Sequence, residues 1–184
     1  MTKTTCTPAD FYYSDYWGIT EAPSTSPHSA GRIEEETGFL TALCNAAGGD
    51  GTASKVERDH IFGMASVKGY TPEAIAKIDG LADAAESKTI EEMAADAKQA
   101  MSIGTLRFAA GSILFESIKA ASKDGLDEKE MEMILCIVEI MGVSKERVQM
   151  MMEVVAEAEE EELKKKRIAA CISNHPCLAP EYKN

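Results

Sequence analysis

The sequence AAGGDGTASKVE at residues 46–57 decides the fold, because a close copy of it, AASKDGLDEKE, returns at residues 120–130. The match extends to both sides, over residues 39–71 in the first copy and 113–144 in the second. Equivalent positions lie 74 residues apart up to the Asp-Gly pair and 73 residues apart after it, so the second turn is one residue shorter. Such self-similarity predicts an internally duplicated domain, each copy being a helix, an acidic turn and another helix.

The segments around the two turns begin and end as helices do. Ser54 followed by Glu57, and Thr89 followed by Glu92, form capping boxes, and Thr71-Pro72 is an N-cap with proline at the first helical position. Apolar residues between these signals recur at three- and four-residue spacing. The sequence therefore predicts an all-α fold of about seven helices in two pseudo-symmetric repeats, without a strand.

Three parts of the chain differ in composition. Residues 1–32 form an arm, with the aromatic segment FYYSDYW at residues 11–17 followed by a linker rich in serine and proline. Residues 33–170 form the helical domain, and residues 171–184 form a tail that contains two prolines. Exposed aromatic side chains form an apolar patch that favours association. The arm therefore either packs on its own domain or binds a partner.

The chain is strongly acidic, with a formal net charge of −12. This charge repels phosphate backbones and anionic membrane surfaces, which argues against nucleic-acid binding. It attracts divalent cations and basic protein surfaces, although acidity also keeps a protein soluble. No apolar run approaches the roughly 18 residues that a membrane-spanning helix needs, so we expect no membrane insertion.

The five cysteines are odd in number and lack the spacing of a disulfide framework. Cys44 and Cys136 lie within apolar helical patterns, where a free thiol behaves as a small hydrophobic group. We therefore expect a reducing compartment and a cytoplasmic protein. Cys171, His175 and Cys177 are zinc-ligand types, but they supply three of the four protein ligands that structural zinc requires.

The two acidic turns are the candidate binding site. Neither is an EF-hand, because the first two ligand positions of that loop would fall on Ala46 and Gly48 in the first copy. A looser set of carboxylates remains, and it predicts a site for a divalent cation, Ca²⁺ or Mg²⁺. Its members are Asp50, Glu57 and Asp59 in the first copy and Asp124, Asp127, Glu128 and Glu130 in the second. The alternative is purely structural, since acidic residues also satisfy the free N–H groups of helix N-termini and Asp-Gly favours turns.

Two further features carry charge. His60 follows Asp59. It is either a metal ligand or a general base, or a residue of the surface or one that supports a site without touching the ligand. In the last predicted helix, acidic residues precede basic ones and predict three intrahelical i,i+4 ion pairs. These pairs are Glu160–Lys164, Glu161–Lys165 and Glu162–Lys166. The interleaved acids argue against a nucleic-acid-binding patch.

The residues around the turns resemble the TerB-like tellurite resistance family. The similarity is carried by residues 47–58 and 63–73 in the first half and by residues 120–130 and 140–144 in the second, within a region of about 35–170. The resemblance implies an all-α fold of about seven helices in two repeats, an association with stress and tellurite resistance, and acidic clusters that bind metal. The metal-site residues that it implies are Asp50, Glu57, Asp124 and Glu130. The shortened second turn departs from the first.

Two classes of function follow from these observations. The first is a non-enzymatic stress-response binding module whose acidic turns hold a divalent cation or a basic protein partner. The second is a scaffold or assembly subunit that docks through the aromatic arm and the last helix. An enzyme with a carboxylate-bound metal is a third class, for which the sequence offers no motif.

Overall fold

The computed structural model of the chain describes residues 32–101 and 110–173, and every regular element within them is a helix. Among the described residues, seven helices have nine residues or more, and α4 is a single turn. The elements are α2 (Arg32–Ala47), α3 (Lys55–Val67), α4 (Pro72–Ile75), α5 (Ile78–Glu86), α6 (Ile90–Met101), α7 (Ala110–Ala121), α8 (Glu128–Ile140) and α9 (Lys145–Ser173). The predicted all-α fold of about seven helices is confirmed.

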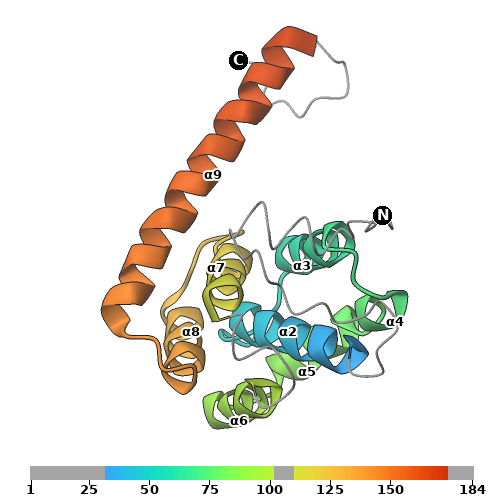
Figure 1. Cartoon of the computed structure of the whole chain (residues 1–184), viewed down its shortest axis with the longest axis vertical. Coiled ribbons are helices and arrows are strands. Elements are labelled where there is room, and N and C mark those ends of the chain that lie inside the picture. The colour runs from blue at the N-terminus through green and yellow to red at the C-terminus, as the bar shows by residue number, and fades with distance from the viewer. Residues whose placement is uncertain (1–31, 102–109, 174–184) are drawn as a thin grey trace, which may run out of the picture.

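Helix α2 is the centre of the domain. It packs against α5, α6, α7 and α8, and Figure 1 shows it surrounded by the other helices. Its apolar residues Phe39, Leu40 and Leu43 are fully buried. A helix that is apolar on most of its circumference must be covered on all sides, which explains why the remaining helices assemble around α2.

The repeat in the sequence is a repeat in the structure. Helices α2 and α3 flank the first acidic turn, and helices α7 and α8 flank the second. Gly51 and Gly125 occupy the same place in the two turns. Their φ angles are +99° and +113°, in a region that residues other than glycine rarely adopt. The turns therefore share an unusual backbone conformation although the second is one residue shorter.

Both turns end in a capping box. Ser54 caps α3 and Glu57 reaches back to the Ser54 N–H at 2.7 Å. In the second repeat Asp127 takes the place of the serine, and Glu130 reaches back to the Asp127 N–H at 2.8 Å. The predicted boxes at Ser54 and at Thr89 are confirmed.

The structure differs from the sequence-based prediction in one place and adds an ion pair in another. The helix expected from Thr71 onward is divided into α4 and α5, whereas the equivalent part of the second repeat is the continuous start of α9. Of the predicted intrahelical pairs, Glu161–Lys165 forms at 3.2 Å. The carboxylate of Glu162 binds Lys119 of α7 at 2.5 Å, because α9 packs on α7 along this face, and the charge of Lys166 also acts on it.

The aromatic segment at residues 11–17 and the tail residues His175 and Cys177 lie outside the described residues. Helix α9 continues to Ser173.

Candidate functional site

The two capping glutamates meet where the repeats face each other. Glu57 and Glu130 are 1% and 3% exposed, and their side chains are joined by a hydrogen bond. One oxygen of each carboxyl accepts the backbone N–H of its own cap residue. A hydrogen bond between two carboxyl groups requires a proton, because an ionised carboxylate has no donor.

The backbone of the first turn lies directly on the start of α8. A Cβ atom added to Gly49 would stand 3.0 Å from the Glu130 Cα and 3.2 Å from the Met133 Cβ. Any larger residue would force these neighbours to move by a few tenths of an ångström, and a close approach to a neighbouring backbone is a typical use of glycine. The contact between the repeats therefore brings Glu57 and Glu130 together.

Burial controls the protonation of this pair. Desolvation raises the pKa of Glu130 to about 8, and the neighbouring Glu57 and Asp127 raise it further against the opposing hydrogen bond from the Asp127 backbone. Desolvation also raises the pKa of Glu57, with a contribution from the charge of Asp124. Two carboxylates in contact cannot both ionise without a large electrostatic cost, so the pair holds a proton at neutral pH.

The two aspartates of the turns lie at the surface. Asp50 is exposed and its Oδ1 accepts the Thr52 N–H at 2.7 Å, as expected for an Asx turn. Asp124 is also exposed, and it lies near enough to Glu57 for its charge to act on that carboxyl. Of the four predicted residues, the structure thus places two in a buried pair and two on the rim.

The oxygen chemistry of this pair suits a hard cation, but the donor set is small. Glu57 Oε1 is buried and accepts no hydrogen bond from an N–H or alcohol group, which leaves it to the contact with the Glu130 carboxyl. Such an oxygen is available to a proton or to a cation such as Ca²⁺ or Mg²⁺. Within residues 32–101 and 110–173, however, no group of three or more His, Cys, Asp or Glu side chains is arranged to hold a metal ion.

Arg58, which sequence reasoning missed, ties the first turn to α5. Its guanidinium binds Asp83 and Glu86, each at 2.6 Å, and its Nε donates to the Ala53 carbonyl at 2.8 Å. Glu86 also accepts the Ala53 N–H at 3.1 Å. The sequence signal was available, because Arg58 follows the capping glutamate directly, but its partners lie 25 and 28 residues away.

A second buried charge cluster joins α3 to α7. Lys68, which is 1% exposed, has its Nζ 3.7 Å from Glu116 Oε1 and 4.1 Å from the centre of the Phe39 ring. His60 Nε2 lies 3.9 Å from the other oxygen of Glu116. Burial lowers the pKa of His60 to about 4 and the pKa of Lys68 to about 8. His60 is thus a neutral, largely buried histidine beside Glu116.

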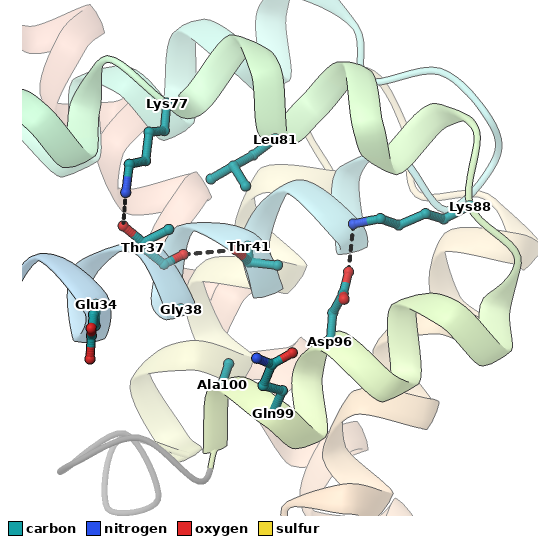
Figure 2. Close-up of a pocket in the computed structure, with 10 residues that line it drawn as sticks. All are labelled: Glu34, Thr37, Gly38, Thr41, Lys77, Leu81, Lys88, Asp96, Gln99 and Ala100. Atoms are coloured by element: carbon teal, nitrogen blue, oxygen red, sulfur yellow. Dashed lines mark hydrogen bonds and ion pairs between the residues drawn. The ribbon is translucent and has the colours of Figure 1, made fainter.

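A separate groove of about 320 Å³ lies between α2, α5 and α6 (Figure 2). Its polar groups bind one another: Lys77 Nζ donates to Thr37 Oγ1 at 3.2 Å, and Lys88 pairs with Asp96 at 2.5 Å. None of the four predicted site residues lines it. The groove is therefore distinct from the acidic turns.

The described thiols behave as the sequence predicts for Cys44 and Cys136. Both are free, and burial raises the pKa of Cys44 to about 12, which makes it an inert core residue. In the described part of the chain no helix is both long and apolar enough to cross a membrane.

Comparison with known proteins supports the fold. The structure is similar to the crystal structure of a tellurite resistance protein from Nostoc punctiforme, with a TM-score of 0.61 over 98% of this chain and 99% of that chain, at 21% sequence identity. No family model and no curated protein matches the chain. The resemblance to TerB-like proteins is thereby confirmed at the level of the fold.

Proposed function

We propose that this protein is a TerB-like binding module whose two acidic turns hold one divalent cation, Ca²⁺ or Mg²⁺, at the contact between its repeats. The observation that carries the proposal is the buried pair Glu57–Glu130, in which Glu57 Oε1 accepts no hydrogen bond from an N–H or alcohol group. Asp124 and Asp50 stand at the rim and would attract the ion and contribute further oxygens. Water would complete the six to eight ligands that calcium prefers.

The chemistry is an exchange of a proton for a cation. The pair is buried, and at neutral pH its charge is reduced by the proton that the two carboxyls share. A divalent cation would neutralise both carboxylates and would remove the cost of holding two charges in contact. Binding should therefore release a proton, and it should strengthen as the pH rises towards 8.

The cellular setting is part of the same proposal. The similar protein from Nostoc punctiforme is a tellurite resistance protein, and we infer a cytoplasmic role in a stress response of that kind. The net charge of −12 also favours a basic protein partner. The exposed Asp50 and Asp124 are the part of the site that such a partner would meet first.

Calorimetric titration with Ca²⁺, Mg²⁺, Mn²⁺ and Zn²⁺ tests the proposal. We expect a binding heat and a raised melting temperature with Ca²⁺ or Mg²⁺. Both should be lost in Glu57→Gln/Glu130→Gln and weakened in Asp50→Asn/Asp124→Asn. Repeating the titration in buffers of different ionisation enthalpy should reveal the released proton.

Glu92→Gln is the matched control. Glu92 forms the same capping contact in α6, at 2.8 Å from the Thr89 N–H, but it is exposed. Cation binding should be unchanged in this variant. If no cation gives a heat or a melting shift, or if Glu92→Gln weakens binding as much as the paired glutamates do, the proposed site is wrong.

A further inference from the structure

Helix α9 extends well beyond the helical body (Figure 1). It has 29 residues, which corresponds to a length of about 44 Å. Its first half packs on α7 and α8, whereas the side chains of residues 163–169 are all exposed. Helical stability in proteins comes mostly from tertiary packing of one face, so the projecting half lacks its usual support in the described structure.

The packed face of α9 is well defined. Val148 and Val155 are each 2% exposed. Farther along the same face, Glu159 binds Lys123 at 2.7 Å and Glu162 binds Lys119 at 2.5 Å. Because successive residues of an α-helix are turned by about 100°, the opposite face can be assigned.

That opposite face carries charges in two blocks. Glu157 and Glu160 come first, and Lys164 and Arg167 follow, all four exposed. None of them has an ion-pair partner in the described part of the chain. The apolar residues Met150, Val154 and Ile168, which are 64%, 50% and 50% exposed, flank the two blocks on the same face. The outer face is thus acidic in one half and basic in the other.

The geometry points to a second copy of this chain as the partner of the outer face, with the two α9 helices antiparallel. A two-fold axis at position 162 would place Glu157 opposite Arg167 and Glu160 opposite Lys164, and symmetry would repeat both pairs. Closed two-fold dimers use one self-complementary surface in this way. This inference is independent of cation binding.

The antiparallel arrangement follows from the charges. A parallel pair would place acid against acid and base against base, which is destabilising. Each helical body lies on the inner side of its own α9, so that the two bodies would not collide. The dimer should be weak and sensitive to salt, because two chains of charge −12 repel each other and the attracting groups are exposed.

Sedimentation equilibrium of the full chain under reducing conditions tests the inference with three variants. The first is Lys164→Glu/Arg167→Glu and the second is Glu157→Lys/Glu160→Lys. The third combines all four changes and keeps the net charge at −12, since two charges of each sign are exchanged. Circular dichroism checks that each variant keeps its helix content.

We expect a dimer of the natural sequence that weakens at high salt, and at least about tenfold weaker self-association of each double variant. An equimolar mixture of the two double variants should form a heterodimer, and the fourfold variant should dimerise again. A natural chain that stays monomeric overturns the inference. So do double variants that dimerise like the natural chain, or a mixture in which no heterodimer forms.

Discussion

The two acidic turns have similar backbone conformations, and each is followed by a buried glutamate. They are nevertheless held to the rest of the molecule by different ion pairs. In the first repeat Arg58 holds the turn against Glu86 of α5. The equivalent of Arg58 in the second repeat is Met131, and the equivalent of Glu86 is Glu159. Glu159 instead binds Lys123, which stands where the first turn has Gly49.

This difference shows that a duplicated fold can keep an ion pair at the same place while the residue that supplies the positive charge changes. Each repeat anchors its turn through an acidic residue at the same position, but the cation comes from α3 in one repeat and from the turn itself in the other. With glycine at position 49, the first turn can lie against α8. The asymmetry of the anchors therefore permits the close contact in which the symmetric glutamates meet.

The largest effect is expected from breaking the pair of glutamates. The pKa of Glu130 is about 8 in the fold against 4.5 for an ordinary glutamate. Its contribution to stability is therefore complete below about pH 4.5 and is lost as the pH rises towards 8. Glu130→Gln removes the titrating group and with it this loss. Between pH 4.5 and pH 8 the free energy of unfolding of the variant should therefore rise by several kcal/mol relative to that of the natural protein, since each pKa unit corresponds to about 1.4 kcal/mol.

Urea unfolding across this pH range measures the difference between Glu130→Gln and the natural sequence. Glu92→Gln is the control, because the carboxyl that it removes caps α6 at the exposed surface and not in a buried pair. A constant difference between Glu130→Gln and the natural protein from pH 4.5 to pH 8 would contradict the shared proton.

The next effect concerns the anchor of the first turn. Arg58→Met gives the first repeat the residue that the second has at this position. It removes the ion pairs with Asp83 and Glu86, the longer one with Asp79 at 4.0 Å, and the bond to Ala53. We expect a loss of about 2 kcal/mol, since hydrogen bonds of charged groups contribute about 1.5–3 kcal/mol and this site is partly exposed. A double-mutant cycle with Glu86→Gln measures the coupling, which should be near zero if the anchor is unimportant.

A smaller and equal effect is expected at the two turn glycines. Gly51→Ala and Gly125→Ala each place a side chain at a positive φ, with no atom within 4 Å to obstruct it. Each should cost about 1–2 kcal/mol through backbone strain alone. Thermal unfolding should give the same loss for both variants, and clearly unequal losses would mean that the turns differ in conformation.

The smallest effect is a gain. Gly63 lies exposed inside α3 with nothing near its Cβ position, and the second repeat has Cys136 at the equivalent place. Gly63→Ala should stabilise the protein by about 0.5–1 kcal/mol, because glycine loses more conformational freedom in a helix than alanine does. A fall in the melting temperature would show that the position has a close neighbour.

The sequence by itself determined the elements and the repeat. Capping residues, helical periodicity and glycines at turns act over a few residues, so Ser54 with Glu57 and the turn at Asp50-Gly51 could be recognised without a structure. The candidate residues Glu57 and Glu130 were found because the same pattern occurs twice. The division of α4 from α5 was not found, since the apolar spacing continues across it.

Tertiary structure alone decided which charges meet. Glu57 and Glu130 are 73 residues apart in the chain, and Lys68 and Glu116 are separated by 48. Glu162 has Lys166 at helical spacing, and its carboxylate binds Lys119 across the packing of α9 on α7. Burial and long-range contact shift the pKa values of Glu57, Glu130 and Lys68, and both depend on how the helices pack, which local sequence patterns do not encode.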